Sequence, residues 1–251
     1  MKNISRPRGS RVRLRDDGNL IMAKPDYKAF YSELEQRALA EGMTLFGVAS
    51  LETVRASFHP TLKRVASQFD RAISIGYRLP DAVIEEIEDH PTLLYASAYK
   101  TANWLLDQTA ARLATLIQRA GGKAMPIAAS QIVDWEAQLG HLSHKLVGKE
   151  AGHGWIGRSS LLVNPHHGAR VRYATVLTDL ALPLDVPHNG SCGECRECIE
   201  RCPAGAISEE GYDKQKCLAM LKSFASTKGI VQYICGVCVK TCPAATRAPE
   251  L

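Results

Sequence analysis

The first 191 residues of this 251-residue chain contain no cysteine, and all eight cysteines lie between Cys192 and Cys242. No disulfide can therefore join distant parts of the long N-terminal portion. The sequence also lacks an apolar run of the roughly 18 residues that a membrane-spanning helix needs. No apolar segment follows its basic start, as a secretory signal peptide would require. These absences argue against a disulfide-rich secreted protein and predict a cytoplasmic protein without a membrane span.

Positive charge is concentrated at the N-terminus. Residues 1–22 contain six basic and two acidic side chains, which account for +4 of the formal net charge of +5. The rest of the chain is almost neutral, which argues against extensive nucleic-acid binding. Residues 1–24 show no periodicity and are predicted to be a disordered basic tail, or an extension before an alternative start at Met22. A nucleic-acid-binding arm is the alternative.

Residues 25–183 alternate between helical and strand patterns, which predicts a layered α/β (or α+β) domain. The clearest helix runs from Pro91 to about Ala120, with apolar residues at helical spacing and Gly121 at its end. Other helices are expected at 26–42 and 142–151. Strands are expected at 45–50, 72–76, 123–129, 161–164 and 171–177, the last two joined by a hairpin-like turn at 165–168.

The cysteine segment carries the strongest motif. Its first part fits C-x2-C-x2-C-x3-C-P, the bacterial ferredoxin spacing for a 4Fe–4S cluster, with Cys192, Cys195, Cys198 and Cys202. Residues 235–243 repeat the last three cysteines and the proline, and the isolated Cys217 can supply the missing ligand. After the proline-rich linker at 182–187, residues 184–251 are therefore predicted to form a small ferredoxin-like domain with two 4Fe–4S clusters.

In two-cluster ferredoxins the fourth cysteine of each run ligates the other cluster. This rule predicts one cluster on Cys192, Cys195, Cys198 and Cys242. It predicts the other cluster on Cys202, Cys217, Cys235 and Cys238. Structural zinc is the alternative for four-cysteine sites, but zinc does not explain the third cysteine at the same spacing or the two Cys-Pro ends.

A glycine-rich stretch precedes the cysteine segment. Gly152, Gly154 and Gly157 fit G-x-G-x-x-G, with Trp155 inside the motif. A dinucleotide-binding motif must follow a strand and open a helix, whereas this stretch follows a predicted helix and precedes a strand. It is interpreted as a tight turn whose backbone can seat a ligand or cofactor.

Several polar residues near this turn are candidates for chemistry. His141, His144 and Lys145 lie within five residues, and Asp134 lies in the preceding loop. These four are the candidate acid or binding groups, because a reduction needs a proton donor; solvated surface side chains are the alternative. Arg172 is a candidate for binding an anionic group of a cofactor or substrate, with an exposed strand face as its alternative.

Three features together resemble the epoxyqueuosine reductase family. They are the run 151–165, the run 170–179 and the eight-cysteine pattern with the isolated Cys217. The resemblance implies an α/β domain that binds cobalamin, two 4Fe–4S clusters, and reduction of an epoxide on a modified tRNA nucleoside. The sequence departs from the family where an aspartate proton donor is expected, since it has Ala128-Ala129-Ser130 there. The family's C-terminal helical repeats are also absent from this sequence.

The function expected from these observations is an iron–sulfur oxidoreductase. Electrons from a ferredoxin-type or flavodoxin-type donor would pass through the two clusters to a site in the α/β domain, with cobalamin as a possible cofactor. The substrate would be a small molecule or a modified nucleoside. The alternative is an electron-transfer or accessory protein that serves a partner enzyme and has no catalysis of its own.

Overall fold

The structure is a computed structural model that describes residues 13–14, 20–21, 26–227 and 229–243. Its centre is a four-stranded sheet in the order β3-β4-β8-β5, in which all neighbouring strands are antiparallel. The strands are β3 (Leu45–Ser50), β4 (Arg71–Arg78), β8 (Val171–Thr178) and β5 (Ala124–Ile127). This sheet, covered by helices, confirms the predicted α/β class.

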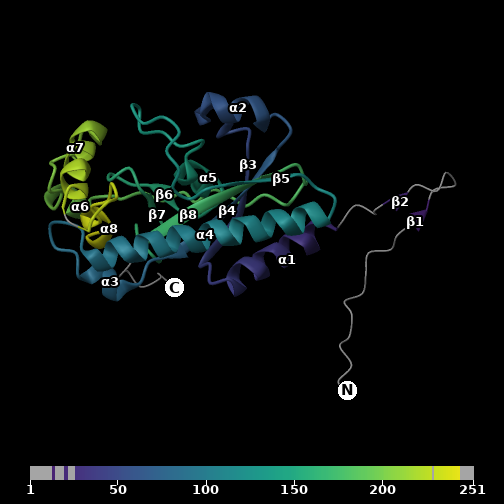
Figure 1. Ribbon diagram of the computed structural model, residues 1–251, viewed down its shortest axis with the longest axis horizontal. Coiled ribbons are helices and arrows are strands. Elements are labelled where there is room, and N and C mark those ends of the chain that lie inside the picture. The colour runs from purple at the N-terminus through teal and green to yellow at the C-terminus, as the bar shows by residue number, and fades with distance from the viewer. Residues whose placement is uncertain (1–12, 15–19, 22–25, 228, 244–251) are drawn as a thin grey trace, which may run out of the picture.

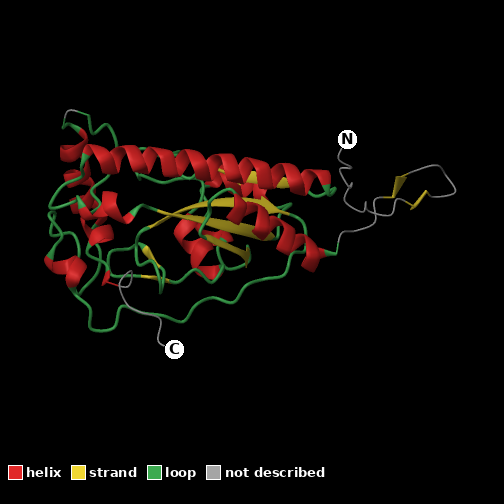
Figure 2. Cartoon of the chain, turned by 90° about the horizontal axis from the view of Figure 1, so that it is seen from below, coloured by secondary structure: helices red, strands yellow, loops and turns green. Residues whose placement is uncertain are grey.

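Helices α1 (Tyr27–Ala40) and α4 (Leu93–Arg119) cover one face of the sheet, and α4 runs along the whole sheet (Figures 1 and 2). Asp26 caps α1 and Thr92 caps α4, each through its side chain. Leu106, Leu113 and Ile117 are fully buried. Burying a side chain of this kind contributes about 1.5–3 kcal/mol, so the predicted apolar stripe holds α4 against the sheet.

The other face is covered by shorter elements: η1 (Arg55–Ser57), α2 (Pro60–Ala66) and α5 (His144–Glu150). Their core includes Phe69, Val147 and Leu177. Side chains alternate along β8, so Ala174 and Val176 face α4, while Leu177 faces this second core.

One strand pairing differs from the sequence prediction. β7 (Leu162–Val163) pairs with β6 (Trp155–Ile156), and no pairing of β7 with β8 occurs within the described residues. The turn at 165–168 is closed instead by a single bridge between Asn164 and Gly168. The Asn164 side chain accepts from two turn amides and donates to the His153 carbonyl, which holds the turn against the preceding glycine-rich stretch.

The cysteine segment lies at one end of the sheet, where α6 (Glu197–Glu200), α7 (Lys214–Ala225) and α8 (Val237–Lys240) gather (Figure 1). It shares an apolar cluster with α3 (Asp81–Glu85) and the start of α4. Arg170 is buried and binds Asp81 and Glu85 on α3 as well as the carbonyl oxygen of Lys240 on α8. These contacts fix the last cysteines against the sheet.

The prediction for the basic tail falls largely outside the described residues. Its described parts, β1 (Arg13–Leu14) and β2 (Leu20–Ile21), form an antiparallel pair. Across the part of the chain that the structure covers, no helix has both the length and the apolarity to cross a bilayer. The domain boundary expected at residues 183 and 184 stays a prediction.

Candidate functional site

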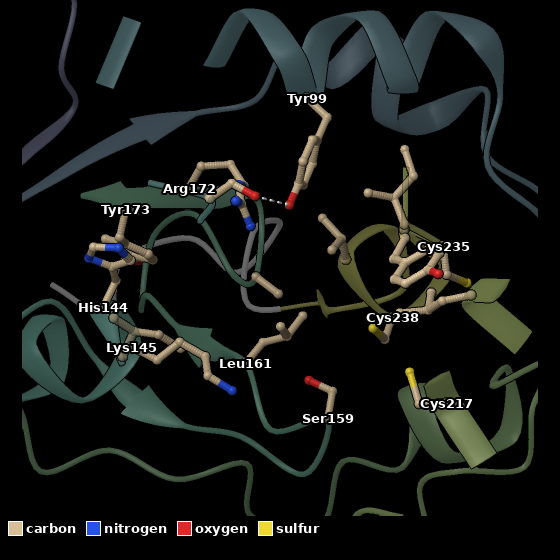
Figure 3. A pocket seen from close by; sticks show the side chains of 18 of the residues that line it. Tyr99, His144, Lys145, Ser159, Leu161, Arg172, Tyr173, Cys217, Cys235 and Cys238 are labelled. Atoms are coloured by element: carbon tan, nitrogen blue, oxygen red, sulfur yellow. Dashed lines mark hydrogen bonds between the residues drawn. The ribbon is translucent and has the colours of Figure 1, made fainter. Parts of the chain in front are cut away.

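A cavity of about 510 Å³ opens at the end of the sheet where β8 begins. One wall comes from the sheet and α4, including Ala128 after β5, Val171 on β8 and Tyr99 on α4. The opposite wall belongs to the C-terminal segment and includes Cys202, Cys217, Cys235 and Cys238 (Figure 3). Small-molecule sites typically have volumes of about 300–1,000 Å³. The cavity can therefore enclose a ligand directly beside these four thiols.

Burial and neighbouring thiols raise the pKa values of three cysteines. The pKa of Cys198 rises to about 11, first through burial and then through the thiols of Cys192, Cys195 and Cys242. Burial also raises the pKa of Cys235 to about 11. A hydrogen bond with the Val237 backbone opposes this rise, and the thiols of Cys217 and Cys202 add to it. Burial followed by Cys235, Cys217, Cys198 and Cys202 raises the pKa of Cys238.

The thiols that influence Cys198 and Cys235 belong in each case to one predicted set, whereas Cys238 is also influenced by Cys198 of the other set. Crowded thiols oppose one another's ionisation, and a metal cluster, which binds thiolates, removes this conflict. The donor set therefore fits iron–sulfur ligation. Among the residues that the structure describes, no three His, Cys, Asp or Glu side chains converge closely enough to hold a metal ion. The ligand assignment stays a prediction.

The glycine-rich turn lies beside the first cysteine set. A Cβ added to Gly157 would lie 3.2 Å from the Cys192 sulfur. Gly154, with φ of +146°, leaves so little room that an added Cβ would lie 1.9 Å from the Val163 carbonyl oxygen. Neither these residues nor Gly152 and Trp155 line the cavity, although Ser159 and Leu161 immediately after the turn do. Their predicted role in binding a cofactor stays a prediction.

Arg172 lines the cavity and is anchored to α4. Its guanidinium donates to the Asn103 side chain at 3.0 and 3.3 Å, and its Cζ lies 4.2 Å from the centre of the Tyr99 ring. Burial raises the pKa of Tyr99, but the Arg172 charge and hydrogen bonds with Ser130 and Asn103 outweigh burial, so the pKa is lowered overall. Tyr99 is thus a stronger acid than an ordinary tyrosine, and its hydroxyl faces the cavity (Figure 3).

His144 lines the cavity with both ring nitrogens engaged. Nδ1 lies 2.8 Å from the Thr175 hydroxyl, and Nε2 lies 3.0 Å from the Ala128 carbonyl oxygen. Burial lowers the pKa of His144 to about 4, so the ring is neutral at pH 7. A neutral ring that donates to a carbonyl oxygen is suited to holding the end of β5 against β8. Its predicted role as an acid or binding group stays untested.

The other two candidates from the sequence differ in position. His141 lines the cavity, and its Nδ1 lies 3.2 Å from the Thr61 hydroxyl. Asp134 does not line the cavity; its carboxylate accepts from the Ala137 amide at 2.8 Å and closes a turn. Their predicted roles remain open, with His141 the better placed of the two.

Lys145 is the second cationic side chain of the cavity. Its ammonium donates to the carbonyl oxygen and, at 3.3 Å, to the hydroxyl of Ser160. Burial, followed by the charge of Lys214, lowers the pKa of Lys145. Ser160 has φ of +58°, a left-handed conformation that is uncommon for a residue with a side chain. Sequence reasoning selected Lys145 but missed Ser159 and Tyr99, whose position depends on the packing of the turn and of α4 against the sheet.

No family model matches the chain. It is 34% identical to epoxyqueuosine reductase from Bacillus anthracis over 116 residues, which cover 41% of this chain and 30% of that protein. The corresponding enzyme from Aliivibrio fischeri is 35% identical over 105 residues, which cover 38% of this chain and 28% of that protein. The chain thus spans about 30% of the length of the curated relatives that it matches.

Solved structures show the same fold. The reductive dehalogenase NpRdhA in complex with 3-bromo-4-hydroxybenzoic acid matches 95% of this chain and 34% of its own, with a TM-score of 0.71 at 21% identity. A reductive dehalogenase described for B12-dependent dehalogenation matches 92% of this chain and 33% of its own, with a TM-score of 0.70 at 20% identity.

An epoxyqueuosine reductase with an epoxyqueuosine-modified tRNA stem loop matches 87% of this chain and 66% of its own, with a TM-score of 0.61 at 18% identity. The resemblance expected from the sequence is therefore confirmed. Over part of its length, this chain is similar to epoxyqueuosine reductases, and it shares a fold with them and with reductive dehalogenases.

Proposed function

We propose that this protein is an iron–sulfur reductase in which a ligand in the cavity receives electrons from the adjacent cysteine set. One observation carries the proposal: the cavity has four thiols on one wall and the acidified Tyr99 on the other. An electron source and a proton source thus face the same volume. Residues 25–183 would form the α/β domain that holds the ligand, and residues 184–251 the ferredoxin-like two-cluster domain.

The cysteines divide the electron path into an outer and an inner part. The outer cluster would be held by Cys192, Cys195, Cys198 and Cys242, and the inner cluster by Cys202, Cys217, Cys235 and Cys238. Four-iron clusters, when bound, supply single electrons. Charged, exposed side chains surround the outer loop, including Glu194, Arg196 and Glu197. A ferredoxin-type or flavodoxin-type donor would dock there, because the inner set faces the cavity.

Tyr99 would deliver the proton that a two-electron reduction requires. Its hydroxyl lies 3.5 Å from the Ser130 hydroxyl, and Arg172 stabilises the phenolate that forms after the proton leaves. The chain has Ala128-Ala129 where the resemblance to the family implies an aspartate. Tyr99, on the neighbouring helix α4, would therefore act as the proton donor in place of that aspartate.

A corrinoid is the proposed cofactor of the cavity. When bound, its cobalt supplies redox chemistry at a low potential. The apolar side chains of Leu79, Leu161 and Ile234 would contact its ring. The buried hydroxyl of Tyr173, also in the cavity lining, has no hydrogen-bond partner among the described residues, so it is available to a polar group of the cofactor. The B12-dependent enzyme of the same fold supports this choice.

The accessory alternative has one specific observation in its favour. Leu93, Leu94 and Val231 are 61%, 60% and 74% exposed. The loop that carries Val231 contacts Leu93, since a Cβ added to Gly229 would lie 2.6 Å from it. This apolar surface could receive a partner enzyme. Turnover by the isolated protein would exclude the accessory role.

The proposed function is tested with anaerobically reconstituted protein and cobalamin. Binding should shift the visible spectrum of the corrinoid, and dithionite-reduced protein should then reduce it. The Tyr99→Phe variant should retain both steps, since these need no proton from the phenol, but should slow any turnover. If intact, cluster-loaded protein neither shifts nor reduces the corrinoid, the cofactor part of the proposal fails.

A further inference from the structure

The charge of the cavity lining is one-sided. Two basic side chains, Lys145 and Arg172, line it, whereas no aspartate or glutamate occurs among the described lining residues. Some basic side chains elsewhere among the described residues form an ion pair with a carboxylate. Lys149, on the same helix as Lys145, pairs with Glu150 at 3.2 Å. Arg158, beyond that helix, pairs with Glu209 at 2.7 Å.

Within the described residues, neither cavity cation forms an ion pair of that kind. Removing a charge from water is costly unless an opposite charge or strong hydrogen bonds compensate for the lost hydration. The lining thus carries two basic side chains and no carboxylate that would supply the balancing negative charge. A bound anion would supply it, while a cationic amine would be repelled.

The two cations are not equally available. Arg172 already donates twice to Asn103, approaches the Ala129 carbonyl oxygen at 3.5 Å and stacks on Tyr99. Lys145 donates to two oxygens of Ser160, and an ammonium has three N–H groups. One donor of Lys145 therefore remains for a ligand.

Ser159 lies next to that remaining donor. Its residue is 7% exposed, and its hydroxyl and the Lys145 ammonium point toward the same part of the cavity (Figure 3). Lys214 adds positive charge nearby, while its own ammonium is held by the carbonyl oxygens of Ala137 and Gln138. An ammonium with a neighbouring hydroxyl can bind two oxygens of a carboxylate or phosphate.

The rest of the lining suits a flat apolar body. Five of the eight tyrosines of the chain line the cavity, together with aliphatic side chains: Tyr95, Tyr99, Tyr173, Tyr212 and Tyr233. Aromatic rings favour edge-to-face or offset contacts with other planar groups. The lining thus combines the Lys145 ammonium with aromatic and aliphatic side chains that can pack against a planar ring.

We propose that Lys145 and Ser159 form an anion-binding subsite, and that the substrate of this cavity is a flat apolar molecule that bears a carboxylate or phosphate. The identification of this ligand as a substrate rests on the proposed reductase function. Binding of the ligand does not, because the subsite binds it whether or not electrons are transferred. In this proposal Lys145 recognises charge, and Tyr99 remains the proton donor.

A second explanation for Lys145 must be separated from this one. A 4Fe–4S cluster with four thiolates carries negative charge, so Lys145 could balance the inner cluster alone. In that case replacing Lys145 would change the reduction potential of the cluster but leave ligand charge without effect on binding. The proposal requires the opposite, namely that ligand binding depends on Lys145 and on the charge of the ligand.

The test measures binding of matched small probes to the cluster-loaded protein by calorimetry. Benzoate and phenyl phosphate carry the anion, benzamide is the neutral analogue, and benzylamine is the cation. Both anions should bind at least about tenfold more tightly than benzamide, as expected for a hydrogen bond to a charged group. Two anions are used because carboxylate and phosphate ligands share this chemistry, and the tighter one identifies the source.

Lys145→Gln should reduce the preference for anions over benzamide to less than about threefold. Lys149→Gln, on the same helix but paired with Glu150, should leave it unchanged. Iron content and circular dichroism, measured on both variants, show whether each is folded and loaded. Equal binding of the probes, a preference for benzylamine, no binding of any probe, or an undiminished preference in folded Lys145→Gln would each overturn the proposal. Because no electron transfer is measured, a failed reductase assay leaves this result intact.

Discussion

The two cysteine sets differ in what surrounds them. The outer set, represented by Cys192 and Cys195, lies in an exposed loop beside the glycine-rich turn. The inner set, represented by Cys217 and Cys238, faces a cavity with tyrosines, Arg172 and Lys145. The same residue type thus occurs in two environments. If both sets hold clusters, as proposed, the outer cluster would be accessible to a donor and the inner cluster would contact the ligand of the cavity.

Beside the outer set, the glycine-rich turn and the exposed cysteine loop should respond very differently to substitution. Gly154→Ala would place a Cβ 1.9 Å from a backbone oxygen at a φ of +146°. This is the largest effect expected, at least about 4 kcal/mol of lost stability, because neither backbone can move freely. Gly193→Ala in the outer loop, where φ is +53° and nothing lies within 4 Å, should cost only about 1–2 kcal/mol. Urea unfolding of both variants compares them.

If Gly154→Ala proved as mild as Gly193→Ala, the turn would be adaptable. The close contact between the turn and the outer cysteine set would then lose its meaning as a rigid support.

Two arginines attach the cysteine segment to the α/β layer. Arg170, with a side chain 6% exposed, binds Asp81, Glu85 and the Lys240 carbonyl, which lies between Cys238 of the inner set and Cys242 of the outer set. Arg170→Met should lower stability by about 3 kcal/mol, because these hydrogen bonds are lost in a buried place. Arg158, which donates to the Gly193 carbonyl near the outer set, is more exposed. Arg158→Met should therefore lower the free energy of unfolding by less than about 1 kcal/mol.

Equilibrium denaturation of the two variants measures this difference. Equal losses would contradict the idea that Arg170 is the firmer of the two attachments.

Two buried histidines that pack against the sheet, His144 at the start of α5 and His153 just after it, should make stability depend on pH. Burial lowers the pKa of His153 and of His144 to about 4. Unfolded histidine has a pKa near 6.5, so the unfolded chain binds protons first as the pH falls. Stability should therefore decrease between about pH 6.5 and pH 4. The loss is at most about 3 kcal/mol for His153, and smaller for His144, which touches the cavity. Chemical unfolding at several pH values measures it.

His144→Gln should reduce this pH dependence while preserving a hydrogen bond to the Ala128 carbonyl oxygen. A variant with an unchanged pH profile would show that folding does not lower the pKa of His144.

The sequence predicted those features that depend on spacing. The apolar stripe of α4 and the strand at 45–50 follow from local periodicity, and the structure contains both. The pairing of β6 with β7 was missed, because two-residue strands carry almost no periodic signal. The contact between Tyr99 and Arg172 was also missed, since it arises only when α4 packs on β8. Asp134 looked favourable by position, but its direction is set by a turn hydrogen bond.

The central claim, that the two cysteine sets hold two clusters, is tested most directly by iron quantitation after anaerobic reconstitution. The parent should bind about eight irons per chain, and Cys195→Ser and Cys217→Ser should each lose about four. Met220→Leu, a control on the same helix as Cys217 and in the same cavity wall, should lose none. Unchanged iron in Cys217→Ser, or zinc in place of iron in the parent, would contradict the account.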